Sequence, residues 1–227
     1  MRRKCSIVGC EKEAKRGGLC WTHEFSQRYK TNRQFRENRN KTKRGYNQRL
    51  LQRYRDKIAD ALGGWKCSGF GNTEKGVLAF DHKDGGGEYE RNKMGGQLPT
   101  IRYYFHNIEE AKERLRVLCA NCNWKMNALE RYGRGASRTA GWLRTTREEL
   151  IEVLGGHRCL NCGVRDISVL TIDHIDGGGT KERRLMGGYL QMIQHYSTHT
   201  EAARQKLQVL CRNCNWKRHL VRSGLVG

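Results

Sequence analysis

The sequence predicts an α+β protein built from small modules in tandem rather than from one large domain. Of its 227 residues, 37% are hydrophobic and 30% are charged, so one large hydrophobic core is not expected. Ten cysteines, most of them in closely spaced pairs, offer another way to stabilise small units. In a reducing compartment such pairs are typical of metal ligands, and we therefore expect zinc-stabilised modules.

An internal repeat defines two of these modules. Segments 62–126 and 154–218 are identical at 32 of 65 positions, with a constant offset of 92 residues. Both copies contain LGG, DH-x-DGGG and VLC-x-NCNWK in the same order. A unit of this length is too long for a solenoid repeat, so each copy is expected to fold as a small domain.

The repeat divides the chain into five segments. They are an N-terminal zinc module (1–27), a basic helical linker (28–58), a first repeat (59–128), a short linker (129–145) and a second repeat (146–222). Apolar residues at near-helical spacing from Tyr46 to Leu62 predict a lead-in helix for the first repeat. Thr146 and Glu149 fit a capping box that would begin the second lead-in helix, and the glycines and arginines of 128–145 predict irregular structure.

Each copy has the pattern of two strands followed by a helix. Short apolar runs at 77–82 and 169–174 predict a buried strand that three glycines end. The second strand is expected at 116–119 and 208–211, and the helix at 121–132 and 212–223. A further helix is expected within 98–114.

The cysteines predict up to three zinc sites. In the second copy, two C-x2-C knuckles supply the four thiolates of a closed structural site: Cys159, Cys162, Cys211 and Cys214. In the first copy only Cys67, Cys119 and Cys122 remain, because Phe70 stands where the fourth thiolate is expected. Either an unrelated fourth ligand completes this site, or it holds no zinc and Phe70 replaces the metal by apolar packing. Cys5, Cys10, Cys20 and His23 fit a separate N-terminal site with three thiolates and one imidazole.

The charge balance indicates a polyanionic partner. Lys and Arg number 44 against 23 Asp and Glu, which gives a formal net charge of +21. The segment 28–57 is strongly basic, and we expect it to contact the DNA backbone. The residues chosen for this role are Arg33, Arg36, Arg39, Lys43, Arg44 and Arg53. The aromatic residues between them, Tyr29, Phe35 and Tyr46, either stack on bases or pack against the protein.

Polar residues at the end of the first strand and the start of the last helix form a candidate catalytic group. Asp81-His82 and Asp173-His174 end the strand, and Asn123 and Asn215 follow the last cysteine, 41 residues after each histidine. Asp and Asn oxygens suit a hard cation such as Mg²⁺, and a neutral histidine suits a general base that activates water. The alternative is structural: Asp-His caps a turn and Asn caps a helix.

These motifs resemble the HNH, or ββα-metal, endonucleases, particularly phage-type and homing-endonuclease-like members. The resemblance covers roughly 60–127 and 152–219. It implies that His82 and His174 are general bases, that Asp81, Asn123, Asp173 and Asn215 bind a catalytic divalent cation, and that the cysteine knuckles bind structural zinc. Two features depart from the family pattern: the last motif position is Asn rather than His, and no middle Asn is evident near Arg114 or Lys206. The N-terminal cysteine set is similar to short zinc modules found ahead of some phage HNH domains.

The leading hypothesis is therefore a metal-dependent endonuclease acting on double-stranded DNA, a monomer with two sites that mimics a homodimer. The main alternative is a zinc-stabilised nucleic-acid-binding protein with vestigial catalytic sites, and a zinc-based transcriptional regulator is a weaker third. No stretch approaches the ~18 apolar residues of a membrane helix, and the first ten residues lack the apolar core of a signal peptide. We expect no membrane partner and a location in the cytoplasm of a bacterium or a phage-infected host cell.

Overall fold

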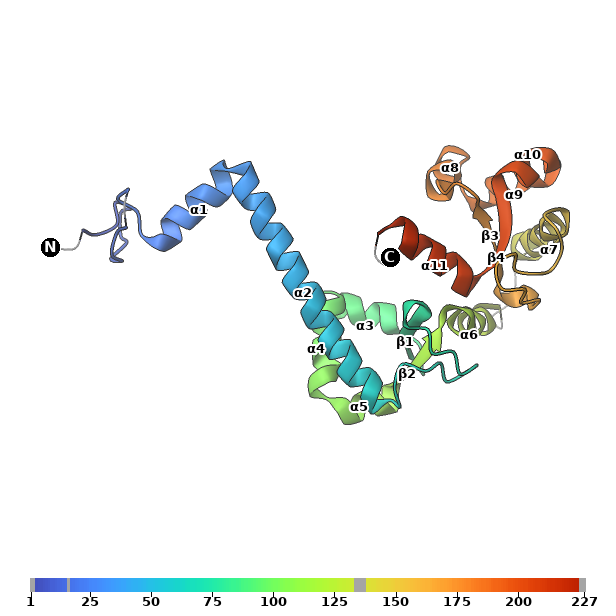
Figure 1. The fold of residues 1–227 in the computed structure, drawn as a ribbon, viewed down its shortest axis with the longest axis horizontal. Helices are drawn as coiled ribbons and strands as arrows, with labels where there is room; N and C mark the ends of the chain where they lie inside the picture. The colour runs from blue at the N-terminus through green and yellow to red at the C-terminus, as the bar shows by residue number, and fades with distance from the viewer. Residues whose placement is uncertain (1–2, 16, 133–137, 225–227) are drawn as a thin grey trace.

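The computed structural model describes residues 3–15, 17–132 and 138–224. Its N-terminal segment holds an isolated β-bridge between Lys4 and Glu13 and is followed by helix α1 (Trp21–Thr31) and the long helix α2 (Arg33–Ala61). Figure 1 shows this N-terminal part extending away from the two repeats, with α2 leading into the first of them.

Helix α2 joins the N-terminal module to the first copy. Its 29 residues span about 43 Å at 1.5 Å per residue. Asn32 caps its start by accepting a hydrogen bond from the N–H of Phe35 at 2.9 Å. Ile58 and Ala59 in its last turns are buried, where the helix packs on the first copy. The predicted lead-in helix is present, but it begins 13 residues before Tyr46.

The first copy places three helices between two antiparallel strands. After a 3-10 turn, η1 (Lys75–Val77), the elements are β1 (Leu78–His82), α3 (Gly87–Lys93), α4 (Gln97–His106), α5 (Ile108–Arg114), β2 (Leu115–Cys119) and α6 (Ala120–Tyr132). In the register of the pair, Asp81 lies opposite Arg116 and His82 opposite Leu115. The strand–strand–helix order agrees with the sequence prediction, whereas α3 and the division of 98–114 into two helices were not predicted.

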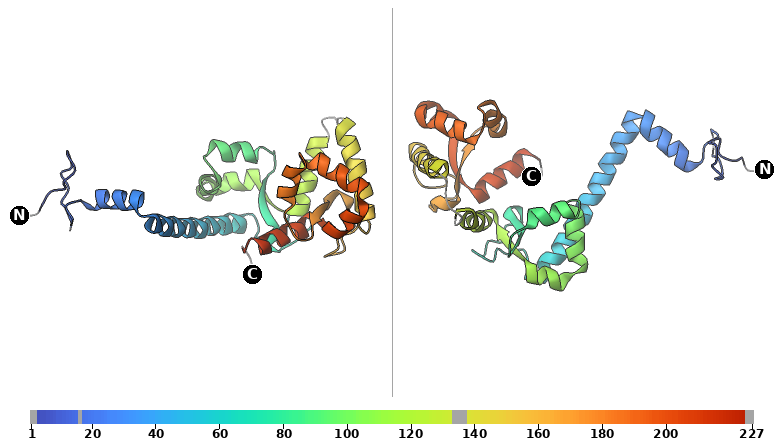
Figure 2. Two further views of the ribbon diagram at one scale, coloured as in Figure 1. Left: turned by 90° about the horizontal axis from the view of Figure 1, so that it is seen from above. Right: turned by 180° about the vertical axis from the view of Figure 1, so that it is seen from behind.

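The second copy has the same order of elements. Helix α7 (Arg138–Val153) leads into η2 (Ile167–Val169), β3 (Leu170–His174), α8 (Gly179–Leu185), α9 (Tyr189–Thr198), α10 (Thr200–Lys206), β4 (Leu207–Cys211) and α11 (Arg212–Arg222). Here Asp173 lies opposite Gln208, and His174 opposite Leu207. Figure 2 shows the copies from two further sides.

The prediction for the segment between the copies was wrong in two respects. Helix α6 continues to Tyr132 and α7 begins at Arg138, so the described part of 129–145 is helical; 133–137 lie outside the described residues. Thr146 lies within α7 and is 6% exposed, so it does not cap the helix start. The physical reason is packing: Leu143, upstream of the predicted cap, already contacts the core of the second copy and extends the helix backwards.

The cores of the two copies are organised differently. The second has one continuous cluster that includes Leu150, Ile151, Val209 and Tyr196 together with three of its cysteines. The first has two clusters, one around its three cysteines and the other around Ile58 and Tyr104. The candidate catalytic residues of the second copy, Asp173, His174 and Asn215, are therefore supported by a single contiguous core.

A pseudo-twofold junction joins the copies through α6 and α11. The backbone N–H of Asn121 donates to the side chain of Asn213 at 3.0 Å, and the N–H of Asn213 donates to the side chain of Asn121 at 2.9 Å. Two equivalent ion pairs flank this exchange. Lys125 pairs with Asp166 at 2.5 Å, and Lys217 pairs with Glu74. Each contact is repeated with an offset of 92 residues, as in an isologous dimer interface.

Candidate metal centres and catalytic site

The structure brings together all three predicted groups of zinc ligands. The ligand atoms within each group lie within 4.8 Å of one another. The groups are Cys5, Cys10, Cys20 and His23; Cys67, Cys119 and Cys122; and Cys159, Cys162, Cys211 and Cys214. The ten cysteines, all within the described residues, form no disulfide.

The sulfur spacing fits tetrahedral zinc. Four thiolates about 2.3 Å from zinc are about 3.8 Å apart. The sulfurs of Cys10 and Cys20 are separated by 3.8 Å, and those of Cys162 and Cys211 by 3.7 Å. In the N-terminal group, Nδ1 of His23 lies 3.2 Å from the sulfur of Cys5. These donor sets match zinc in number, type and spacing.

Backbone amides support thiolate formation in the second copy. Burial acts to raise the pKa of Cys159, but N–H groups of Cys211, Cys162 and Asn161 outweigh it and lower that pKa to about 7. The side-chain amide of Asn161 also donates to the sulfur of Cys214 at 3.3 Å. Burial instead raises the pKa values of Cys211 and Cys214, so these two thiols would ionise on binding a cation.

The first copy has three thiols and no replacement packing at the fourth position. Phe70 is 68% exposed, like its equivalent Cys162, and Lys125 lies over its ring at 5.6 Å. The hypothesis that Phe70 substitutes for metal by apolar packing was therefore wrong. The backbone of the loop already fills the space beside the thiols, because a Cβ on Gly69 would lie 2.7 Å from the sulfur of Cys122. The side chain of Phe70 therefore lies outside that space.

Each candidate general base is held by a glutamate that the sequence pattern did not single out. Nε2 of His82 lies 2.5 Å from Glu90, and Nε2 of His174 makes the same contact with Glu182. Tyr104 donates to Glu90 at 2.8 Å, and Tyr196 to Glu182 at 2.7 Å. A cation completes each network: Arg114 in the first copy and Lys206 in the second.

These networks keep the glutamates ionised. Burial acts to raise the pKa of Glu182, but hydrogen bonds from Tyr196, His174 and Lys206 hold that pKa below its ordinary value. An ionised carboxylate only accepts, so Nε2 of His174 is the donor in this contact, and in the neutral imidazole the lone pair is then on Nδ1. Glu90 is held in the same way by Tyr104 and His82, and its pKa is also lowered. Identity between the copies could have revealed Glu90/Glu182 and Tyr104/Tyr196 from sequence.

The third glycine of each DGGG motif makes room for the histidine. A Cβ on Gly179 would lie 2.5 Å from Nδ1 of His174, and one on Gly87 would lie 2.4 Å from Nδ1 of His82. The nitrogen left basic by the glutamate thus faces the glycine loop. Only glycine permits so close an approach.

In the second copy, the predicted catalytic residues line one open cavity of about 680 Å³. Asp173, His174 and Asn215 lie along it with Gly177–Gly179, and Trp124 reaches it from the first copy. Arg183, Arg212 and Arg222 line it as well. Asp173 accepts a hydrogen bond from Gln208 at 3.0 Å, and among the described residues no hydrogen bond ties Asn215 to it. The side-chain oxygens of Asp173 and Asn215 are ligands of the type that a hard divalent cation prefers, and His174 lies beside them.

In the first copy, the equivalent oxygens are occupied by neighbouring side chains. Arg116 places Nε at 2.8 Å and Nη2 at 2.7 Å from Oδ2 of Asp81. Asn123 donates to Oδ1 of Asp81 at 3.1 Å, and its own Oδ1 accepts from Asn127 at 2.9 Å. The structure thus brings Asp81, His82 and Asn123 together. Unlike Asp173, however, Asp81 is bound directly by a guanidinium and by the asparagine.

The predicted DNA-contacting residues all lie on α2. Arg33, Arg39, Lys43, Arg44 and Arg53 are exposed, and Arg36 is half-buried because it donates to the carbonyls of Tyr29 and Lys30. Over 28–57 there are twelve Lys and Arg residues and two acidic ones, Glu37 and Asp56. Helix α2 is therefore a long, positively charged helix, called the basic rod below.

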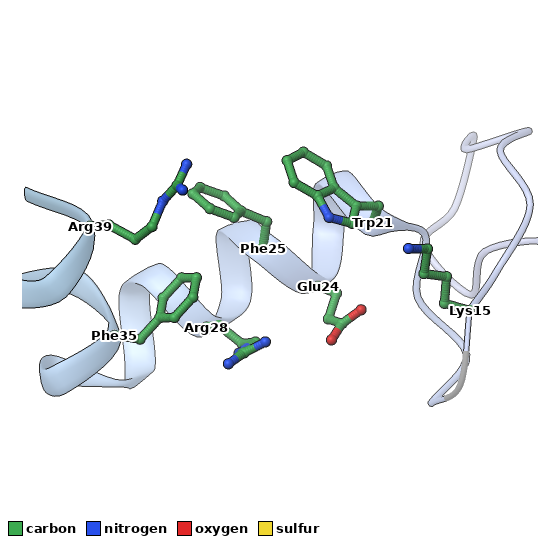
Figure 3. A pocket seen from close by; sticks show the side chains of 7 residues that line it. All are labelled: Lys15, Trp21, Glu24, Phe25, Arg28, Phe35 and Arg39. Atoms are coloured by element: carbon green, nitrogen blue, oxygen red, sulfur yellow. The ribbon is translucent and has the colours of Figure 1, made fainter. Parts of the chain in front are cut away.

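Trp21 and Phe25 of α1 and Phe35 of α2 form an aromatic cluster at the bend between the two helices, here called the elbow (Figure 3). Trp21 stacks on Phe25 with centroids 5.3 Å apart, and Phe25 meets Phe35 edge-on at 5.5 Å. Arg28 lies over Phe35 at 4.4 Å, and Arg39 over Phe25 at 5.2 Å. Phe35 is therefore a packing residue of the elbow, whereas Trp21 and Tyr46 are each 58% exposed.

No family model, curated protein or solved structure matches this chain. The assignment of function therefore depends on the site itself. No helix among the described residues combines the length and apolar character needed to cross a bilayer.

Proposed function

We propose that this protein is a metal-dependent endonuclease of the HNH type, with its catalytic centre in the second copy. The observation that carries the proposal is the cavity where Asp173, His174 and Asn215 meet among arginines. A basic nitrogen, oxygen donors for a cation and positive charge for a phosphate are the groups that phosphodiester hydrolysis requires.

His174 acts as the general base. Glu182 accepts from Nε2 and fixes the ring, which leaves Nδ1 to take a proton from water at the glycine-lined side of the cavity. Tyr196 and Lys206 hold Glu182 in turn. No middle Asn of the HNH pattern is evident near Lys206, and Glu182 orients the imidazole instead.

Asp173 and Asn215 would hold the divalent cation. When bound, such a cation stabilises negative charge that develops on the scissile phosphate. Gln208 positions Asp173 from the neighbouring strand through one hydrogen bond. Gln208 brings no charge of its own to Asp173, and the nearest guanidinium nitrogen lies 3.7 Å away, on Arg218.

Arg212 lines the same cavity and would bind the phosphate of the substrate. Its guanidinium lies 3.5 Å over the ring of Trp124. Its Nε is buried and is the one such side-chain nitrogen or oxygen without a partner among the described residues. Burial, together with the charge of Arg147, lowers the pKa of Arg212 to about 10. Because the side chain of Arg212 also lines the cavity, its positive charge is suited to an anion there.

The basic rod of α2 would hold the DNA backbone. Its charges are almost all of one sign and most are exposed, as expected for binding that displaces counterions. The exposed Trp21 at the elbow could add contact with unpaired bases.

Incubation of the zinc-loaded protein with supercoiled plasmid tests this function. Mg²⁺ should convert supercoiled DNA into the relaxed form, and EDTA should stop the reaction. Binding without any cleavage in Mg²⁺ or Mn²⁺ would instead support the alternative, a zinc-stabilised nucleic-acid-binding protein. The arginine-bound Asp81 of the first copy is the observation that favours that alternative.

A further inference from the structure

The two copies differ at the residue opposite the candidate metal-binding aspartate. The strand register places Arg116 opposite Asp81, and Gln208 opposite Asp173. Side chains directly opposite on an antiparallel pair contact each other, so this difference sets which group hydrogen-bonds each aspartate from the neighbouring strand. Asp81 is bound closely by a guanidinium, whereas Asp173 is hydrogen-bonded by a neutral amide.

Both carboxylate oxygens of Asp81 already accept hydrogen bonds. Arg116 holds Oδ2 of Asp81 with two nitrogens, and Asn123 holds Oδ1. The pair is sheltered, because the side chains of Asp81 and Arg116 are 15% and 23% exposed. A charge-assisted pair that is largely removed from water is strong, and a divalent cation would have to displace the guanidinium and meet its repulsion.

The arginines near Asp173 are arranged differently. Arg218 and Arg222 form longer ion pairs with Asp173, with Nε of Arg218 at 3.7 Å and Nη1 of Arg222 at 4.0 Å from Oδ2, beyond hydrogen-bond distance. Both instead donate to the backbone carbonyl of Ile175. Of the two, Arg222 lines the cavity, where its charge can meet a phosphate.

The first copy also completes the cavity of the second. Trp124 of the first copy supports Arg212, whereas the position equivalent to Arg212 is Ala120. The reciprocal tryptophan, Trp216, contacts His219 of its own helix and is 48% exposed. The asparagine contacts at the junction are therefore the same in both directions, whereas the tryptophan–arginine contact is made only at the cavity of the second copy.

We infer that the first copy is a cation-free subunit that supports the second, and that the protein cuts one strand of DNA per binding event. This inference rests on the proposed nuclease function. The donor set of the first copy does not fit a divalent cation, because Arg116 already takes its place.

Counting bound Mn²⁺ by electron paramagnetic resonance tests the inference without relying on activity. Zinc-loaded wild type should bind one Mn²⁺, and Asp173→Asn should bind none. Arg116→Gln, or Arg116→Gln with Asn127→His to copy the second site, should bind two. Gln208→Arg should abolish binding while zinc content is retained.

Plasmid cleavage provides the second readout. Wild type should accumulate relaxed plasmid, and the Arg116→Gln variants should produce linear plasmid at early times. Two Mn²⁺ per wild-type chain, one in a folded Arg116→Gln variant, or retained binding in Gln208→Arg would each overturn the inference. If the Arg116 variants do not fold, the Gln208→Arg result decides. Wild type that binds no Mn²⁺ and leaves plasmid intact would refute the nuclease function itself.

Discussion

Asn121 and Asn213 each accept a hydrogen bond from the backbone N–H of the other. They occupy the same position in the two copies, and each lies between the two cysteines of the second knuckle. The exchange links the zinc-ligand turn of one copy directly to that of the other. Trp124 and Arg212, which meet across the same junction, lie within three residues of these asparagines.

Replacing Asn121 or Asn213 by Ala should weaken the junction. Each change leaves one backbone N–H without its partner, which costs about 1 kcal/mol of unfolding free energy. Urea unfolding of the zinc-loaded protein measures this, with the exposed Asn92→Ala as the matched control. Equal stability of all three variants would show that the asparagine exchange does not hold the copies together.

Glu182→Gln should slow cleavage by about 10- to 100-fold with zinc content unchanged, because a neutral amide no longer fixes the tautomer of His174. Single-turnover cleavage measures the chemical step. Glu90→Gln makes the same change in the first copy and should have a much smaller effect. A larger loss of activity in Glu90→Gln would mean that the working site lies in the first copy.

Zinc content should follow the number of ligands. The two four-ligand groups should retain about two zinc ions through dialysis, and the three thiols of the first copy should bind a third more weakly. Phe70→Cys should secure the third ion, because position 70 is equivalent to Cys162 and its side chain is exposed, so the change leaves the core intact. Metal analysis measures this, and fewer than two zinc ions in the wild type would contradict the ligand assignment.

Neutralising Arg33, Arg36, Arg39 and Lys43 should flatten the salt dependence of DNA binding. The slope of log affinity against log salt falls by about 0.9 for every phosphate that is no longer neutralised. Neutralising the exposed Lys93 and Arg102, which lie off the rod, should change it much less. An unchanged slope in the α2 variant would show that the rod is only a solvated surface.

Local pattern and the internal repeat predicted the strands, the last helix of each copy and the grouping of all zinc ligands. They did not predict the start of α7, because Leu143 contributes to packing that no capping signal reports. The roles of Glu90 and Glu182 were missed because each lies on a seven-residue helix after three glycines, where periodicity carries little information. The difference between Arg116 and Gln208 is visible in the sequence, but only the strand register shows that these residues lie opposite Asp81 and Asp173.

The most direct test of the central claim is plasmid cleavage in Mg²⁺ by His174→Ala. Loss of a general base typically costs about 10²- to 10⁴-fold, so relaxed plasmid should form at least about 100 times more slowly than with wild type. Zinc content and DNA affinity should be unchanged, since His174 contacts Glu182 rather than a zinc ligand. Cleavage by His174→Ala at the wild-type rate would contradict the assignment of the second copy as the catalytic centre.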